Sequence, residues 1–153
     1  MGWSASLAAG PFDPQQEYSD FLSRSDEDGA VVTFLGIARP RSRKGEPVER
    51  LLLDHHPKLT QASLNEISNT ATVKFPVTRV CVVHRYGSVD PTEPIVWVAV
   101  AATHRRAAFE AADYLMDRLK TDAVFWKRED GANSSCWIEP TEADRAERAR
   151  WSE

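Results

Sequence analysis

The chain has 153 residues, of which 42% are hydrophobic and 27% charged, and its formal net charge at pH 7 is −4. These values are typical of one globular domain, exclude disordered and fibrous chains, and argue against a non-specific nucleic-acid binder, which would carry a basic excess. The longest apolar run, residues 95–102, is far shorter than the roughly 20 residues that span a bilayer, and the N-terminal residues lack the basic and apolar regions of a signal peptide. We therefore expect a single domain over residues 1–153, in the cytoplasm, with no membrane and no nucleic-acid partner.

The chain has two cysteines, Cys81 and Cys136, and neither lies in a pattern with zinc-ligand spacing. We expect a reduced protein with Cys81 buried in an apolar run, and one Cys81–Cys136 disulfide is the alternative. His55, His56 and His84 have no second histidine four residues further along a helix, which predicts structural roles for them. We expect no metal site and no cofactor.

Hydrophobic spacing and turn-forming residues divide the first half of the chain into elements. Gly10-Pro11 and the small polar residues around them predict an irregular arm over residues 1–12. Gly36 lies inside an apolar, β-branched segment and predicts a bulge or a close backbone approach in that strand. The elements predicted after the arm are a helix at 14–25, a strand at 30–38, a basic loop at 39–45, a returning strand at 48–55 and a helix at 58–74.

The second half begins with two almost continuous apolar runs, which are typical of central strands covered on both faces. The predicted elements are strands at 77–86 and 95–103, a helix at 104–119, strands at 123–127 and 135–138, and a helix at 141–151 with Thr141 as its N-cap. Because strands and helices interleave and strands also pair as hairpins, we expect an α+β fold with one mixed or antiparallel sheet and helices packed against it.

The distribution of charge is more informative than its total. Acidic residues exceed basic ones in residues 1–38 and 129–153, whereas basic residues exceed acidic ones in residues 39–50 and 104–128. The two basic segments are therefore the places where the sequence predicts binding of an anion.

The first basic segment is the loop from Arg39 to Lys44, beside a strand end. Arginine offers a fork of donors that matches phosphate and carboxylate groups. Arg39 is our candidate ligand, because it lies at the strand end rather than at the tip of the loop. The alternative interpretation of the loop is a solvated hairpin tip.

The second basic segment begins with His104, Arg105 and Arg106, where a strand gives way to a helix. Backbone N–H groups at a helix N-terminus favour anions, whereas the helix dipole disfavours arginine there. The placement of these cations predicts a bound anion. Salt bridges to Glu110 or to an acidic flank are the alternative.

Two of the five lysines of the chain, Lys120 and Lys127, lie on either side of one helix-to-strand turn. Lys120 follows Met116 by one helical turn at the edge of the apolar face, and Lys127 shares a strand face with Phe125, so both amines are able to converge beside apolar and aromatic walls. Neighbouring cations and partial burial would lower the pKa of a lysine and make it usable as a nucleophile or proton shuttle. The alternative is a helix-terminal lysine favoured by the dipole and a strand lysine that extends to water.

Five motifs follow one another in an order that resembles one known family. They are EDGAVVTFLGIAR (27–39), LDHHP (53–57), VHRYG (83–87), THRRAAFEA (103–111) and MDRLKTDAVFWKRE (116–129). Together they resemble the large, catalytic subunit of molybdopterin synthase over residues 12–151, and residues 119–129 are the most specific part.

The resemblance implies an α/β hammerhead-type fold and a homodimer. Each copy would bind a small ubiquitin-like sulfur-carrier subunit, giving a heterotetramer, and the carrier's C-terminal Gly-Gly thiocarboxylate would enter a pocket of the large subunit. Sulfur would pass to cyclic pyranopterin monophosphate (precursor Z), and two transfers would form the dithiolene of molybdopterin. The family's enzyme needs no metal of its own.

The resemblance also assigns roles to residues, and in the family part of the pocket is completed across the dimer. The assigned residues are Lys120 and Lys127 as the essential lysines, Arg39, His104 and Arg105 as the anion pocket, and Phe34 and Met116 as apolar lining. These residue types suit the chemistry, because cations would hold a cyclic phosphate and a lysine beside the carrier's carbonyl would stabilise or protonate a tetrahedral intermediate. Two other functions remain as alternatives: a non-catalytic scaffold that docks a ubiquitin-like partner, and a general binder of phosphorylated ligands.

Overall fold

The structure is a computed structural model that describes residues 2–151. Within this range four helices occur: α1 (Pro14–Ser23), α2 (Pro57–Lys74), α3 (Arg105–Thr121) and α4 (Glu142–Ala149). Eight strands occur in the same range: β1 (Gly2–Ala8), β2 (Ala30–Ile37), β3 (Arg50–His55), β4 (Arg79–Arg85), β5 (Gly87–Val89), β6 (Pro94–Ala102), β7 (Phe125–Asp130) and β8 (Ser135–Ile138). No helix in residues 2–151 has the length and apolar character needed to cross a membrane.

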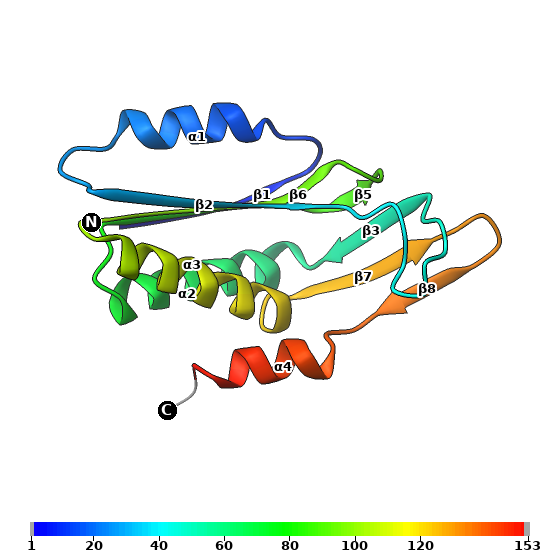
Figure 1. Cartoon of the computed structure of the whole chain (residues 1–153). Coiled ribbons are helices and arrows are strands. Elements are labelled where there is room, and N and C mark those ends of the chain that lie inside the picture. The colour runs from blue at the N-terminus through cyan, green and yellow to red at the C-terminus, as the bar shows by residue number, and fades with distance from the viewer. Residues whose placement is uncertain (1, 152–153) are drawn as a thin grey trace.

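The larger sheet has the strand order β1-β4-β6-β2, with β1 parallel to β4 and the other neighbours antiparallel. Helix α1 covers one face of this sheet, and α2 and α3 cover the other (Figure 1). The prediction that residues 77–86 and 95–103 form central strands is confirmed, because β4 and β6 lie between β1 and β2. The α+β fold class is confirmed as well.

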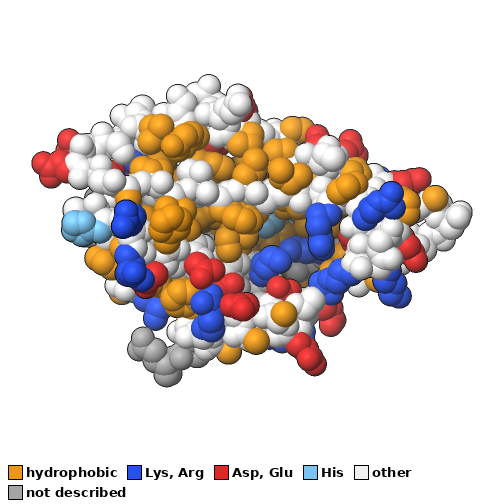
Figure 2. Space-filling view, in the orientation of Figure 1, with side chains coloured by type: hydrophobic (Ala, Val, Ile, Leu, Met, Phe, Trp, Pro, Cys, Tyr) orange, Lys and Arg blue, Asp and Glu red, His pale blue; other side chains and the backbone are white. Residues whose placement is uncertain are grey.

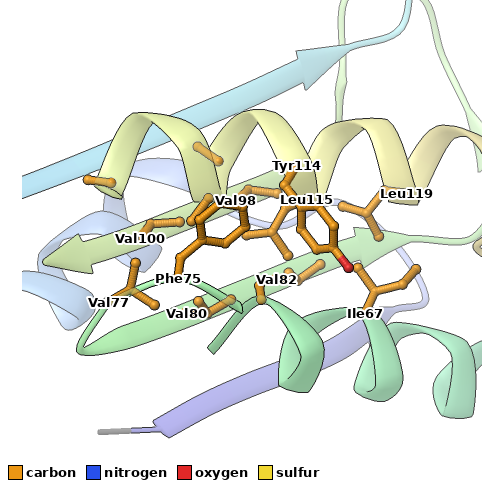
Figure 3. Packing of buried hydrophobic residues seen from close by; sticks show 14 of the residues in the cluster. Ile67, Phe75, Val77, Val80, Val82, Val98, Val100, Tyr114, Leu115 and Leu119 are labelled. Carbon is orange, nitrogen blue, oxygen red and sulfur yellow. The ribbon is translucent and has the colours of Figure 1, made fainter. Parts of the chain in front are cut away.

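The main core lies between the larger sheet and the two helices α2 and α3 (Figure 3). The β-branched residues of β4 and β6 supply its floor, since alternate residues of a strand point to the same face. The helices supply Ile67, Leu115 and Leu119, and Phe75 packs edge-on against Tyr114 with ring centroids 5.4 Å apart. A smaller core on the opposite face holds Trp97 against Phe21 of α1.

The prediction of an irregular arm over residues 1–12 is wrong for most of its length. Residues 2–8 form β1, which pairs in parallel with β4 from Gly2 opposite Arg79 to Ala8 opposite Arg85. Small residues such as glycine, serine and alanine have weak strand preferences of their own. The neighbouring strand provides the hydrogen-bond partners that local sequence does not reveal.

The expectation of one sheet is also wrong. A second sheet has the order β5-β3-β7-β8 with antiparallel neighbours, and β3 pairs with β5 and β7 instead of returning along β2. The inward face of this sheet is held by Leu53 and Val89, which are fully buried and pack with Ala38. Periodicity identifies a strand but not its partner, so the sequence predicted the strands and missed their division into two sheets.

Several local predictions are confirmed. The pairing of β2 with β6 shifts register between Gly36 and Ile37, and a Cβ on Gly36 would lie 2.7 Å from Val96 Cγ1, so both a bulge and a close approach occur there. Thr141 caps α4 and forms a capping box with Asp144. The two cysteines are free, but the prediction that Cys81 is buried is wrong, because its side chain is only partly covered in β4.

Candidate functional site

Lys120 and Lys127 lie where α3 ends and β7 begins. Lys120 occupies the last turn of α3, and Lys127 pairs with Leu53 of β3 and Ile138 of β8 on the inward face of the second sheet. Phe125 precedes Lys127 on that face and packs against both the main core and the core of the second sheet. The flexible side chain of Lys127 therefore extends from β7, on the same face as Phe125, whose ring is fixed by packing.

The structure brings the two lysines together. Burial lowers the pKa of Lys127 from its usual value, and the positive charges of Lys120 and Arg43 lower it further, while the carboxylate of Asp144 acts in the opposite direction. Lys127 is thus surrounded by charges from α3, from the 39–45 loop and from α4. A lysine in such surroundings holds its proton less tightly than a solvated one, which suits proton transfer.

A cavity of about 630 Å³ opens beside Lys127. Its lining residues include Phe125, Trp126, Lys127, Trp137, Arg145 and Arg148, so aromatic and cationic side chains form much of the wall. Figure 2 shows Lys and Arg side chains gathered around a hollow near the middle of the visible face, where α3 leads into β7 in Figure 1. The cavity can receive an extended, partly apolar segment that ends in a negative charge.

His84 closes the inner side of this region. Its ring is 4% exposed, stacks on Phe125 with ring centroids 4.1 Å apart, and lies 2.8 Å through Nδ1 from the carbonyl oxygen of Arg85. Burial lowers the pKa of His84 to about 4, with a smaller contribution from the positive charge of Lys127. Because the carbonyl can only accept, Nδ1 carries the proton of the neutral ring, and His84 adds no charge beside Lys127 at neutral pH.

Helix α4 brings a carboxylate to the lysines. Lys120 Nζ lies 3.7 Å from Asp144 Oδ1, and Asp144 Oδ2 accepts a 2.9 Å hydrogen bond from the backbone N–H of Thr141. Partial burial alone would raise the pKa of Asp144, but the hydrogen bonds from Thr141 and the charges of Lys120 and Arg43 outweigh it and lower the pKa. Asp144 therefore stays ionised in the midst of the cations.

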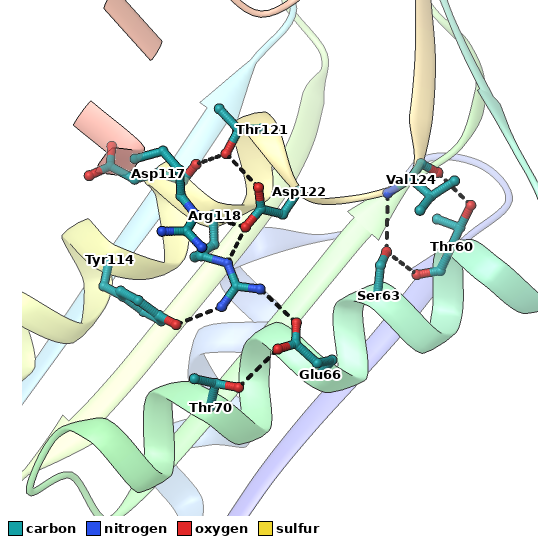
Figure 4. A network of polar contacts seen from close by, with 11 residues as sticks. Thr60, Ser63, Glu66, Thr70, Tyr114, Asp117, Arg118, Thr121, Asp122 and Val124 are labelled. Atoms are coloured by element: carbon teal, nitrogen blue, oxygen red, sulfur yellow. Dashed lines mark hydrogen bonds and ion pairs between the residues drawn. The ribbon is translucent and has the colours of Figure 1, made fainter. Parts of the chain in front are cut away.

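Side chains of α2 fix the backbone between the two lysines (Figure 4). The hydroxyl of Thr60, which is fully buried, donates to the carbonyl of Val124 at 2.5 Å, and Ser63 Oγ accepts from the N–H of Val124 at 3.1 Å. Both polar groups of one residue in the turn are thus held by α2. The position of Lys127, three residues further along, follows from this attachment.

An arginine on α3 joins three elements near the same turn (Figure 4). Arg118 is 8% exposed and donates to Tyr114 at 2.6 Å, to Glu66 of α2 at 2.7 Å and, through Nε, to Asp122. Asp122 also accepts from Arg148 of α4 at 2.7 Å. The network holds the turn and α4 against the body of the protein.

The loop after β2 carries Arg43, whose positive charge acts on Lys127. Gly45, with a φ of 83°, donates from its N–H to the carbonyl of Ser42, so the loop closes as a tight turn, and Arg41 Nη1 donates to Gly45 O at 3.0 Å. Arg43 lies at the tip of this turn and acts electrostatically on both Lys127 and Asp144. Arg39, which the sequence favoured, is exposed at the start of the loop.

Phe34 and Met116 lie on either side of the contact between β2 and α3. Phe34 is 41% exposed and lies on the face of β2 that carries Val32, which packs against the main core below α3. Met116 packs against the same core one turn before Lys120. Met116 therefore lies close to Lys120 along α3, and Phe34 lies on a strand that contacts this helix.

His104 and Arg105 are not brought to the lysines within one chain. They begin α3, which has 17 residues and is therefore about 25 Å long, and Lys120 lies at its other end. Both residues are exposed, and His104 occupies the N-cap position without a side-chain cap bond. In Figure 2 a histidine and basic side chains lie at the left-hand end of the visible face, and hydrophobic side chains separate them from the hollow.

The sequence did not predict that three residues are neighbours of Lys127: Arg43, Asp144 and His84. Arg43 belonged to a basic loop that the sequence singled out, but only the turn shows which arginine faces the lysines. The spacing Thr141–Asp144 is a capping-box pattern, and it signals a helix start and not a site. His84 gave no signal, because a histidine inside an apolar strand is usually a core residue.

No group of three or more His, Cys, Asp or Glu side chains in residues 2–151 is arranged to hold a metal ion. The charged residues that line the cavity are of both signs: Lys127, Arg145 and Arg148 are basic, and Asp122 and Glu139 are acidic. Arg148 is paired with Asp122 at 2.7 Å, so Lys127 and Arg145 are the basic lining residues outside that ion pair.

The chain matches the family model of the MoaE protein over residues 7–122. It is 46% identical to the molybdopterin synthase catalytic subunit of Caulobacter vibrioides over 143 residues, covering 94% of this chain and 93% of that protein, and 44% identical to that of Escherichia coli, covering 92% and 93%.

Solved structures agree with the sequence relatives. The molybdopterin biosynthesis MoaE protein of Burkholderia ambifaria superposes with a TM-score of 0.81 at 33% identity over 100% of this chain and 99% of that one. A subunit in the molybdopterin synthase structure of Staphylococcus aureus superposes with a TM-score of 0.77 at 29% identity over 86% and 94%. The chain belongs to the MoaE family of molybdopterin synthase catalytic subunits.

Proposed function

We propose that this chain is the catalytic subunit of a molybdopterin synthase, which transfers sulfur from a thiocarboxylated carrier subunit to cyclic pyranopterin monophosphate. The observation that carries the proposal is the pair Lys120 and Lys127: Lys127 lines the cavity, and its pKa is lowered by burial and by the charge of Lys120. Family membership supports the same reaction, because the relatives are molybdopterin synthase catalytic subunits. We expect the reaction to take place in the cytoplasm.

The lysines suit the acyl chemistry of the carrier's last glycine. The thiocarboxylate sulfur first attacks a carbon of the pterin side chain, and the oxygen on that carbon leaves as water, which gives a thioester. Water then adds to the glycine carbonyl, and negative charge develops on the carbonyl oxygen. A protonated lysine stabilises this oxyanion and gives a proton to the departing sulfur as the bond between carbonyl carbon and sulfur breaks. The sulfur remains on the pterin, and the carrier leaves with an ordinary carboxylate.

The partner in this proposal is a small ubiquitin-like subunit whose C-terminal tail enters the cavity. A neighbouring structure from Helicobacter pylori, which shares the fold at 18% identity and a TM-score of 0.73, is a complex of subunits 1 and 2 of molybdopterin-converting factor. Lys127, which lines the cavity, supplies a cation that suits a tail ending in a thiocarboxylate.

We further propose that two copies of the chain complete each site. His104 and Arg105 lie at one end of α3 and the lysines at the other, and an exposed apolar strip lies on β2 and α3. The strip consists of Phe34, Leu35, Ile37 and Phe109. A two-fold axis through such a strip would place the basic end of one copy against the lysines of the other, because an isologous interface reverses the direction of the partner.

In this arrangement the phosphate of the substrate is held by His104 and Arg105 of the partner subunit, together with Arg39 at the start of the 39–45 loop. Phe34 and Met116 line the apolar part of the pocket. Each site would therefore hold the substrate's anionic end with groups that one chain alone cannot bring to the lysines.

The reaction is tested with the purified chain, thiocarboxylated carrier and cyclic pyranopterin monophosphate. We expect formation of the dithiolene product, with at least a 100-fold loss in the Lys120→Ala variant, as is typical of a general acid or base. No product from the unaltered chain would overturn the enzyme assignment and favour a scaffold. Tight binding of the pterin that does not depend on the carrier, without product, would favour a general binder of phosphorylated ligands.

A further inference from the structure

Helix α4 is held against the protein by ion pairs and by a residue that follows it, and not by buried side chains of its own. None of the residues of this eight-residue helix is buried. Arg148 pairs with Asp122 at 2.7 Å, and Arg150, just after the helix, pairs with Asp113 at 3.0 Å and with Asp117 at 2.9 Å. A helix with so little buried surface is not needed to complete a core, so its placement calls for another reason.

The residue after Arg150 anchors the same end of the helix. The ring of Trp151 packs edge-on against Phe75 and Tyr114 with centroid distances of 5.7 and 5.5 Å, and its indole N–H donates to Asp117 at 2.7 Å. The C-terminal end of α4 is thus fixed to α3 and to the main core.

The N-terminal end of α4 carries the carboxylate that faces the lysines. The capping box fixes Asp144, because its Oδ2 accepts from the Thr141 N–H at 2.9 Å and its own N–H donates to Thr141 Oγ1 at 3.0 Å. The other oxygen, Oδ1, lies 3.7 Å from Lys120 Nζ, whose side chain is 57% exposed. The carboxylate of Asp144 therefore caps the N-terminus of α4 with one oxygen and pairs with Lys120 through the other.

The charged groups that face Lys127 come from three elements. Lys120 of α3 and Arg43 of the 39–45 loop are positive, Asp144 of α4 is negative, and His84 of β4 is buried and neutral. Asp144 is the one negative group among these neighbours. From this arrangement we propose that Asp144 is a positioning residue of the two-lysine site, whose carboxylate holds Lys120 beside Lys127 and offsets the positive charge around Lys127.

This inference rests on the proposed sulfur transfer, but its main test does not require activity. Asp144→Asn removes the charge and keeps an amide oxygen that can still accept from Thr141. Asp144→Glu keeps the charge, and glutamate is a favoured residue at this capping-box position. Glu147→Gln is the matched control, because it removes one charge from the same helix at a carboxylate that pairs with Arg150 at 2.8 Å.

The measurement is the pH titration of Lys127 in the full chain, followed by NMR on protein labelled at the lysine ε-carbon. The five lysines give a spectrum simple enough to assign. We expect the pKa of Lys127 to be lower in Asp144→Asn than in the unaltered chain, and unchanged in Asp144→Glu and Glu147→Gln. The indole N–H signal of Trp151 shows in each variant whether α4 is still docked.

An unchanged Lys127 titration in Asp144→Asn would overturn the proposal. Equal shifts in Asp144→Asn and Asp144→Glu would also overturn it, because they would trace the effect to displacement of the helix and not to the charge. With carrier and pterin present, we expect about a tenfold lower kcat for Asp144→Asn and an alkaline limb of the pH profile that moves to lower pH. If even the unaltered chain makes no product, the proposed function fails, while the titration still decides the role of Asp144.

Discussion

At the scale of single residues, the amine of Lys127 combines a catalytic role with a cost to folding. Burial and the charges of Lys120 and Arg43 lower its pKa in the folded state. Between that lowered pKa and the ordinary value of 10.5 the unfolded chain binds more protons than the folded one. Burying the ammonium group therefore lowers the free energy of unfolding by its full amount below the folded-state pKa. The free energy of unfolding rises again as pH increases from the folded-state pKa to 10.5.

Replacing Lys127 by methionine should separate these two effects. We expect Lys127→Met to abolish sulfur transfer and to raise the free energy of unfolding at neutral pH by on the order of 1 kcal/mol, because an apolar chain of similar size replaces a buried charge. Urea unfolding measures the change. Lys44→Met, at an exposed position in the loop, is the control and should leave stability and activity near those of the unaltered chain. A destabilised Lys127→Met would mean that the ammonium group is well paired.

His84 predicts a second dependence of stability on pH. Its pKa is about 4 in the folded chain, from a usual value of 6.5, because the ring is buried. Between these two pKa values the unfolded chain binds a proton at His84 and the folded chain does not. The free energy of unfolding therefore falls by up to roughly 3 kcal/mol as pH falls from about 6.5 to about 4.

The phenylalanine variant tests this account of His84. We expect His84→Phe, which keeps an aromatic ring against Phe125 but cannot titrate, to lose much less stability over that pH range than the unaltered chain. Urea unfolding at several pH values provides the slopes. His104→Phe is the control, since His104 is exposed, and it should keep the slope of the unaltered chain. Equal slopes in all three proteins would show that His84 is not the responsible group.

At the scale of elements, the site depends on how α2 holds the turn between α3 and β7. Thr60 Oγ1 donates to Val124 O at 2.5 Å and accepts from the N–H of His56 at 2.9 Å, and its side chain is fully buried. A buried acceptor that loses its donor costs about 1–3 kcal/mol. The same loss frees the backbone that leads to Lys127.

We therefore expect Thr60→Val, which has nearly the same shape, to lower the free energy of unfolding by about 1–3 kcal/mol and to lower kcat as well. Thr60→Ser keeps the hydroxyl and should retain most of the activity. Thermal unfolding and the sulfur-transfer assay measure the two effects. Full activity in a destabilised Thr60→Val protein would show that the attachment serves stability alone.

The elements also show what the sequence predicted and why. Periodicity and caps placed α2, α3 and α4 within a few residues, because amphipathic spacing and N-cap residues act locally. The strand β1 was missed, because its small residues are held by pairing with β4, an interaction that spans more than 70 positions in the sequence. The second sheet was missed for the same reason, since the apolar character of β3 does not reveal that its partners are β5 and β7.

For the candidate site as well, the sequence predicted contacts between residues close in the chain and missed those between distant segments. Lys120 and Lys127 were predicted to converge, because only six residues separate them and helix and strand periodicity fix their directions. Asp144 and Arg43 come from distant segments, and only the fold places them beside Lys127. The resemblance to the family placed His104 and Arg105 in one pocket with the lysines, part of it completed across the dimer, and the length of α3 separates the two sets within one chain.

At the scale of the whole molecule, this separation makes the proposed dimer part of the chemistry. The basic start of α3 and the lysines lie at opposite ends of that helix, and the exposed apolar residues Phe34, Leu35 and Ile37 of β2 and Phe109 of α3 belong to two elements in contact. A two-fold partner would pair the basic start of each α3 with the lysines of the other copy. The homodimer would then hold two equivalent sites, each built from both chains.

Activity in mixed dimers tests this central claim most directly. One variant is Lys120→Ala, and the other combines His104→Ala with Arg105→Ala, which should leave α3 intact because His104 makes no side-chain cap bond. We expect each variant alone to be nearly inactive. Random mixing by co-expression should restore about a quarter of the original activity, because half of the dimers are mixed and each of these has one intact site. A mixture as inactive as its parents would contradict a site shared between two copies of the chain.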